Sequence, residues 1–180
     1  MRYSIIYGGL AGAIIIAVTL VVFFSGVTGI GHGSMLFGYL VMLVALSMIF
    51  VGVKRYRDVE CGGVIRFGRA LGLGLGMALV AALIYIVGWE IYLAATGWDF
   101  MTDYQAQMLA DMQANGASAQ EIADTRATMA VWGERYQSLL WRVPLTFSEI
   151  FPVGLLVALV SAAILRNPRV LPAQRRGATA

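Results

Sequence analysis

Four stretches of the chain are apolar almost without interruption, and each is long enough to cross a bilayer. A helix needs about 20 predominantly apolar residues to span the hydrocarbon. The stretches cover residues 5–25, 34–53, 70–95 and 144–165. The first two contain no charged side chain, the third contains only Glu90, and the fourth contains only Glu149. The pattern predicts four membrane-spanning helices.

Between the third and fourth stretches, the pattern changes to that of two amphipathic helices. Asp99 is a candidate N-cap for the first, Asn115-Gly116 is its stop signal, and Ser118 to Glu121 matches the S-x-x-E capping box of the second. Apolar residues recur at helical spacing in both: Phe100, Tyr104, Met108, Met112, then Ile122, Met129, Trp132, Tyr136, Leu140. We expect a helical hairpin over residues 99–140, with its apolar faces packed on each other, on the membrane helices or on lipid.

The composition agrees with a membrane protein and excludes several other classes. The chain is 59% hydrophobic and 13% charged, whereas soluble domains are about 45–50% apolar and about 25% charged. Its basic residues stand at the ends of the apolar stretches rather than on a polar face, so a nucleic-acid partner is not expected. The single cysteine, Cys61, excludes an internal disulfide.

The distribution of Lys and Arg predicts the orientation of the helices. Ten of the 13 basic residues lie on one side of the expected membrane, and three lie on the other. The ten are Arg2, Lys54, Arg55, Arg57, Arg66, Arg69, Arg166, Arg169, Arg175 and Arg176, and the three are Arg126, Arg135 and Arg142. Cytoplasmic loops carry the excess of positive charge. We therefore expect cytoplasmic termini and an extracytoplasmic loop over residues 96–143, periplasmic in a Gram-negative host.

These features together predict an all-α integral membrane four-helix bundle, with the hairpin between its third and fourth spans. Residues 1–166 are expected to form a single membrane domain, and residues 167–180, which contain two prolines and no periodicity, are expected to be disordered. The basic inner loop over residues 54–69 is either the positive-inside anchor or a segment that lies along anionic headgroups.

Small residues at four-residue spacing indicate where the spans pack. Membrane helices associate through close contact at such residues, because lipid supplies no hydrophobic driving force between helices. The expected packing positions are Gly8 and Gly12 in the first span, Gly68, Gly72 and Gly76 at the third, and Gly154 and Ala158 in the fourth.

The two carboxylates inside the spans are the candidate functional residues. Glu90 lies eighteen residues beyond Gly72, about five helical turns, so it should share the packing face. At 1.5 Å per residue, Glu90 and Glu149 are about 31 Å and 26 Å from the inner end of their spans, which predicts a similar depth near the outer leaflet. Ionisable residues inside spans are costly and mark functional sites by default; the structural alternative is that they neutralise an arginine or cap backbone groups.

Pro152 adds a second polar feature beside Glu149. Pro144 suits the first position of the fourth helix, which places Pro152 inside it. Pro152 has no amide hydrogen to donate to the carbonyl of Ser148. We expect a polar notch there, able to receive a proton, a cation or a donor such as Arg142, Tyr92 or Trp89. His32 lies in the glycine-rich outer loop of residues 26–33; a His-Glu-Glu metal site is conceivable, but no metal and no cofactor is predicted.

Several motifs resemble one known family. "VGVKRYRDVECGGVIRFGRALGLGLGMALVAALIYIVGWEIY" and "FSEIFPVGLLVALVSAAILR" resemble the central and closing blocks of the bacterial membrane family catalogued as domain of unknown function 4199. The most specific matches are the Tyr-Arg-Asp of the inner loop, the Gly-Trp-Glu-Ile-Tyr end of the third span, and the run from Glu149 to Gly154. The resemblance implies four spans, a helical outer insertion and a bacterial inner-membrane location. It implies no activity.

Two functions from different classes remain open at this point. The first is a non-enzymatic membrane protein that works through a membrane-protein partner or a homo-oligomer, in contact with membrane lipid. The second is a small proton- or cation-coupled transporter that uses Glu90 and Glu149 and needs a homo-oligomer to form a pathway. An enzyme is not expected, because the chain contains no nucleophile elbow, no phosphate loop and no HExxH spacing.

Overall fold

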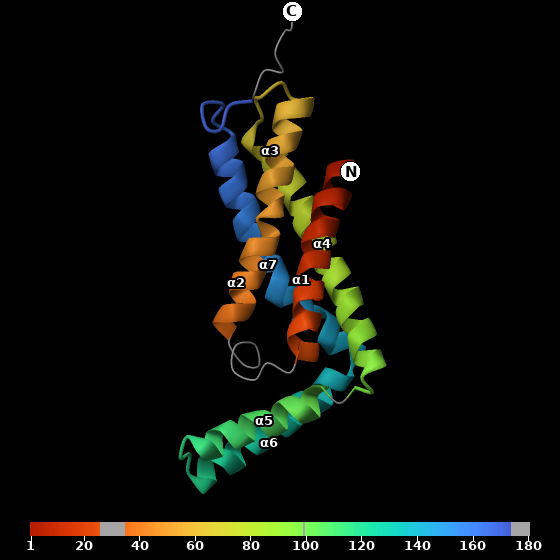
Figure 1. The fold of residues 1–180 in the computed structure, drawn as a ribbon, viewed down its shortest axis with the longest axis vertical. Coiled ribbons are helices and arrows are strands. Elements are labelled where there is room, and N and C mark those ends of the chain that lie inside the picture. Colours follow the sequence, from red (N-terminus) through yellow and green to blue (C-terminus); the bar gives the residue numbers. More distant parts are fainter. Residues whose placement is uncertain (26–34, 99, 174–180) are drawn as a thin grey trace, which may run out of the picture. The chain divides into compact units, whose positions relative to one another are not determined.

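The structure is a computed structural model that describes residues 1–25, 35–98 and 100–173, and its regular elements are all helices (Figure 1). They are α1 (Arg2–Ser25), α2 (Met35–Leu46), α3 (Met48–Glu60), α4 (Phe67–Ala95), α5 (Phe100–Ala114), α6 (Ala119–Gln137) and α7 (Leu139–Leu165). Four segments are long and apolar enough to cross a membrane: Arg2–Val22, Leu36–Glu60, Phe67–Ala95 and Leu139–Leu165. The prediction of an all-α protein with four apolar helices is confirmed.

The chain forms two compact units. The first consists of Met1–Val87 and Phe147–Ala180, and the second of Gly88–Thr146. The first unit holds α1, α2, α3 and most of α4 and α7. The second holds the hairpin α5–α6 with the last residues of α4 and the first residues of α7.

Within the first unit, helices approach closely where the sequence supplies glycine. An ideal Cβ on Gly8 would lie 2.4 Å from the carbonyl oxygen of Met77, and one on Gly12 would lie 2.7 Å from that of Ala81, so α1 packs on the backbone of α4. A Cβ on Gly154 of α7 would lie 2.8 Å from the Cβ of Ala78. Real Cβ atoms do not come this close to backbone, and the absence of a side chain is what permits these contacts.

The packing face of α4 differs from the predicted one. Gly68 and Gly72 are exposed, with nothing within 4 Å of a Cβ, and a Cβ on Gly76 would meet only the side chain of Ser4. Gly74 makes the close contact instead, since its Cβ would lie 2.9 Å from that of Ala158. Residues 72 and 74 point about 200° apart on a helix, and only the neighbouring helices determine which of them is covered. Packing at Ala158 was predicted, but packing at Gly68 and Gly72 was wrong.

This difference provides a matched test of helix packing. Gly8→Ala is expected to destabilise the protein by about 1–3 kcal/mol, because the methyl group would overlap the backbone of α4. Gly72→Ala makes the same chemical change on an exposed helix surface and should leave stability unchanged or raise it slightly. Thermal unfolding of both variants in detergent measures the difference, and equal midpoints would contradict the close approach of α1 to α4.

The second span and its inner loop also differ from the sequence expectation. The helix is interrupted at Ser47, whose hydroxyl donates to the carbonyl of Val44 at 2.6 Å; such back-bonding commonly bends helices. α3 then continues to Glu60 and α4 begins at Phe67. The expected loop over residues 54–69 is therefore only six residues long, from 61 to 66, and Lys54 to Arg57 are helical.

The fourth span begins earlier than expected. α7 starts at Leu139, directly after Ser138, and the amide of Arg142 donates to the carbonyl of Ser138 at 2.9 Å. Pro144 thus lies inside the helix and not at its first position. Residues 139 and 140, predicted as the end of the hairpin, belong to α7. Helix formation by residues 141–143 was missed because Pro144 was interpreted as the first helical residue.

In the second unit, the predicted hairpin is present. Gly116 ends the first helix with φ of 79°, and the amide of Ala117 donates to the carbonyl of Met112 at 3.0 Å, as in a Schellman motif. The predicted capping box is present at Ser118 and Glu121. The backbone amide and the hydroxyl of Ser118 both donate to the carboxylate of Glu121 and hold its pKa below the usual range. Gln105 donates to the carbonyl of Met129 at 2.7 Å and ties α5 to α6.

The predicted apolar stripes are only partly covered. Neither α5 nor α6 contains a buried residue. Half-buried are Phe100, Met108, Met112, Ile122, Met129 and Tyr136, whereas Tyr104, Trp132 and Leu140 are exposed. Two helices alone cannot cover both stripes. The predicted N-cap Asp99 lies outside the described residues, as does His32.

Candidate functional site

Glu90 is paired with Arg142 within the second unit. The guanidinium of Arg142 donates to both carboxylate oxygens, from Nε to Oε1 at 2.7 Å and from Nη2 to Oε2 at 2.6 Å. Its remaining terminal nitrogen, Nη1, donates to the carbonyl of Tyr136 at 2.7 Å. The Arg142 side chain is 3% exposed and that of Glu90 is 22% exposed. This bidentate, charge-assisted geometry is the strongest form of the pair.

Aromatic rings enclose this pair. The guanidinium carbon of Arg142 lies 4.7 Å from the ring centre of Trp98, and the Tyr136 ring is also within cation–π range at 5.7 Å. Trp89 donates from its indole nitrogen to the hydroxyl of Tyr136 at 2.6 Å and stacks with Tyr92, at 5.2 Å between ring centres. The predicted residues Glu90, Trp89 and Tyr92 thus belong to one cluster, with Arg142 at its centre.

The backbone beside this cluster is unusual. α4 ends in a Schellman motif, in which Gly97 has φ of 73° and the amide of Trp98 donates to the carbonyl of Leu93 at 3.0 Å. Trp98 itself has φ of 69°, a left-handed conformation that side chains with a Cβ disfavour. The conformation puts its ring on the guanidinium of Arg142. We interpret the cluster as a clamp that fixes the end of α4 to the junction between α6 and α7.

Glu149, Ser148 and Pro152 are differently placed. All three are on the exposed surface of α7 in the first unit. Glu149 forms no hydrogen bond or ion pair with any residue that the structure describes, whereas Ser148 has a partner of its own. Glu90 and Glu149 belong to different units. Their expected proximity stays a prediction.

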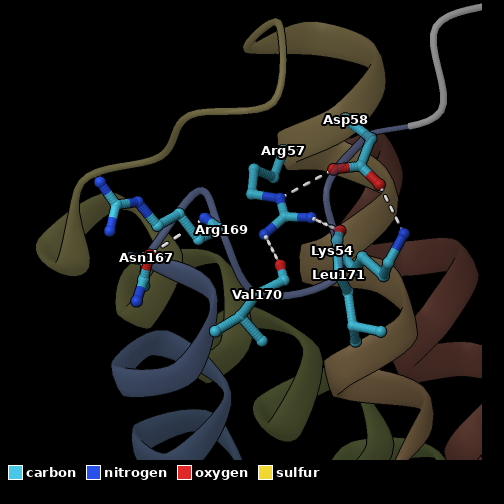
Figure 2. Close-up of polar contacts among 7 residues, drawn as sticks. All are labelled: Lys54, Arg57, Asp58, Asn167, Arg169, Val170 and Leu171. Carbon is cyan, nitrogen blue, oxygen red and sulfur yellow. Dashed lines mark hydrogen bonds and ion pairs between the residues drawn. The ribbon is translucent and has the colours of Figure 1, made fainter.

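A second arginine centre, which the sequence analysis did not propose as a site, lies in the first unit (Figure 2). The side chain of Arg57 in α3 is fully buried. Its Nε donates to Oδ1 of Asp58 at 2.7 Å, and its terminal nitrogens donate to the carbonyls of Val170, at 2.9 Å, and Leu171. Lys54 donates to the other carboxylate oxygen of Asp58 at 2.6 Å, so one carboxylate bridges the two cations of the centre.

The bonds from Arg57 hold the segment that follows α7. Within this segment, the amide of Arg169 donates to the side chain of Asn167 at 3.0 Å, and Leu171 has φ of 47°. An ideal Cβ on Gly63 would lie 3.3 Å from the Cβ of Ala173. The expectation of disorder from residue 167 is therefore wrong for residues 167–173. We call this segment the C-terminal strap; residues 174–180 lie outside the described part of the chain.

Comparison with known proteins gives one result. The family model described as "Protein of unknown function (DUF4199)" matches residues 6–167. The chain belongs to this family. No curated protein and no solved structure matches it. The family match includes Arg57 and Arg142 and ends at residue 167, before the two carbonyls that Arg57 binds.

One motif that this DUF4199 protein shares with its family includes the residues of the Arg57 centre. The Tyr-Arg-Asp motif of the inner loop consists of Tyr56, Arg57 and Asp58. It therefore contains both the buried arginine and the aspartate that pairs with it. Composition alone placed Arg57 with the other positive-inside residues. Among the described residues, no group of three or more His, Cys, Asp and Glu side chains is arranged to hold a metal.

Proposed function

We propose that this DUF4199 protein is a non-enzymatic multi-pass membrane protein that binds a protein partner through the α5–α6 hairpin. We place it in the bacterial inner membrane, with both termini in the cytoplasm and the hairpin in the periplasm. The ten-to-three distribution of basic residues supports this orientation. The family resemblance supports the bacterial location.

The main support is the surface of the hairpin. Tyr104, Val131 and Trp132 are each exposed by 42 to 51% on helices that contain no buried residue. Trp and Tyr are typical anchors of protein contacts, because they bury large areas at low cost in conformational entropy. An arm outside the membrane that leaves such side chains uncovered has surface available for a partner.

The charge of the hairpin favours a protein over lipid. Residues 100–137 contain five acidic side chains, Asp103, Asp111, Glu121, Asp124 and Glu134, and two basic ones, Arg126 and Arg135. An acidic arm is repelled by anionic headgroups and attracted by a basic protein surface. The expected partner surface is therefore basic and contains an apolar pocket.

The Glu90–Arg142 clamp supports the same function rather than transport. A coupling carboxylate must exchange a proton or cation, whereas both oxygens of Glu90 accept hydrogen bonds from one buried guanidinium. The pair instead holds the base of the hairpin, which reduces the entropy lost when a partner binds.

Photo-crosslinking in intact host cells tests this proposal. A photoreactive amino acid at Val131 should capture a discrete protein, and Trp132→Ala should weaken capture by about thirtyfold, the loss expected for a hot-spot side chain worth about 2 kcal/mol. Thr102→Ala, which alters an exposed polar residue of α5, serves as the matched control and should leave capture unchanged.

Two results would contradict the proposal. Adducts to lipid alone would show that the exposed side chains lie on the membrane surface. Capture that is equally strong in the wild type and in Trp132→Ala would show that the apolar surface of α6 does not bind the partner.

A further inference from the structure

Glu149 stands apart from the other charged residues placed within the apolar helices. Arg57 is paired with Asp58, and Glu90 with Arg142. Glu149 is exposed and has no hydrogen bond or ion pair to any described residue. It is also the only charged residue between Val143 and Leu165. Arg57 and Glu90 are therefore paired with opposite charges, whereas no described residue neutralises Glu149.

The position of Glu149 on α7 follows from the packing of that helix in the first unit. The inner face carries Ile150, Gly154, Ala158 and Ala162, all buried, with Gly154 against Ala78 of α4. The outer face carries an exposed stripe at helical spacing: Glu149, Pro152, Leu156 and Val160. We call these four residues the α7 stripe. It is apolar apart from a single carboxylate at one end.

The depth of Glu149 makes an uncompensated carboxylate unfavourable. It lies seventeen residues before Arg166, about 26 Å along the helix axis, and the hydrocarbon is about 30 Å thick. Glutamate is too short to reach far beyond the edge of the hydrocarbon, and even the protonated acid has polar atoms that need partners. Ionisable residues at such positions normally pair with another group inside the membrane.

The part of the chain that the structure describes does not supply the missing partner. Among the described residues, the basic side chains in or beside the spans are either buried and paired, as Arg57 and Arg142 are, or stand at the polar ends of helices and in loops. A second copy would therefore present no cation inside a span. The complementary surface is an apolar membrane helix that contains one basic residue.

We propose that the α7 stripe binds a transmembrane helix of a different membrane protein, and that an arginine or lysine in the outer half of that helix pairs with Glu149. The apolar residues Leu156 and Val160 supply the contact below the ion pair, and Pro152 leaves room for close approach because its helix position carries no long side chain. This contact lies inside the membrane and does not depend on the hairpin surface, so either can fail without the other.

A defined peptide tests the chemistry directly. The probe is a leucine–alanine membrane peptide of about 20 residues with one arginine near its outer end; the reference peptide has leucine at that position. Energy transfer between labelled peptide and the full-length protein in lipid vesicles gives the affinity. The arginine peptide should bind about tenfold more tightly than the reference, as expected for one charge-assisted hydrogen bond, and Glu149→Gln should abolish this preference.

A second experiment tests the contact in native membranes. A photoreactive residue at Leu156 should capture one membrane protein that has a basic residue in a span, and Glu149→Gln should reduce capture about tenfold. The same photoreactive residue at Leu83, an exposed apolar position in α4, is the control. Trp132→Ala, which tests the hairpin, should not alter capture from Leu156.

Each alternative result is decisive. Equal binding of both peptides overturns the proposal, as does capture of a second copy of this chain or of lipid alone at Leu156. Glu149→Gln should not lower the melting temperature of the purified protein, because Glu149 has no described partner within the chain. A clear loss of stability would instead assign Glu149 an internal structural role and overturn the proposal.

Discussion

Arg142→Ala is expected to destabilise the second unit by about 3 kcal/mol, the lower end of the range for removing one partner of a buried ion pair. The variant would leave Glu90 without its donor and the carbonyl of Tyr136 without a hydrogen bond. The loss should be at the lower end because Glu90 is partly accessible to water. Thermal unfolding in detergent measures the change, and limited proteolysis of residues 100–137 should become faster.

Two further variants separate charge from geometry. Arg142→Lys keeps the charge but cannot form the two parallel bonds, so its stability should fall between wild type and Arg142→Ala. The double variant Glu90→Gln with Arg142→Ala should lose less stability than the sum of the single variants, because the two side chains contact each other. Additive losses, or unchanged proteolysis of the hairpin in Arg142→Ala, would show that the pair does not act as a clamp.

Arg57→Ala should release the C-terminal strap and destabilise the first unit by about 3 kcal/mol, since it removes three charge-assisted hydrogen bonds from a fully buried site. Asp58 would keep Lys54 as its partner, so most of the loss should come from the carbonyls of Val170 and Leu171. Digestion by carboxypeptidase should then proceed through the strap to residues near Asn167 in the variant and stop before the strap in the wild type.

The neighbouring Arg55 provides the control. It is exposed and lies in the same helix, so Arg55→Ala should change stability by less than about 0.5 kcal/mol. If Arg55→Ala and Arg57→Ala behave alike, net charge rather than the buried contact would be responsible. An unchanged digestion limit in Arg57→Ala would contradict the role of Arg57 in holding the strap.

The strap and the clamp share a local feature. Leu171 and Trp98 are the two non-glycine residues with positive φ among those described, and each is in contact with a buried arginine: the carbonyl of Leu171 accepts from Arg57, and the ring of Trp98 lies under Arg142. The left-handed conformation costs about 1–2 kcal/mol per residue. The guanidinium contacts offset this cost, so each arginine stabilises a chain path that the local sequence disfavours.

The sequence by itself determined the features that depend on neighbouring residues. Apolar stretches of sufficient length predict the four spans, because a helix is the conformation that satisfies its own backbone groups in lipid. The hairpin was predicted from signals within a few residues of its turn: Gly116 accommodates positive φ, and Ser118 and Glu121 together cap the N-terminus of α6. Such signals act locally and need no knowledge of the rest of the fold.

The tertiary structure decided what depends on residues far apart in the chain. Gly72 and Gly74 are equally suited to close packing, and the position of Ala158 selects Gly74. Glu90 and Arg142 are 52 positions apart, and Arg57 and Val170 are 113 apart. The composition gives the number of charged residues but not which of them form ion pairs or hydrogen bonds. Those contacts depend on how residues from separate parts of the chain come together. For the same reason, only the packing of α7 revealed that Glu149 is exposed and has no ion pair with a described residue.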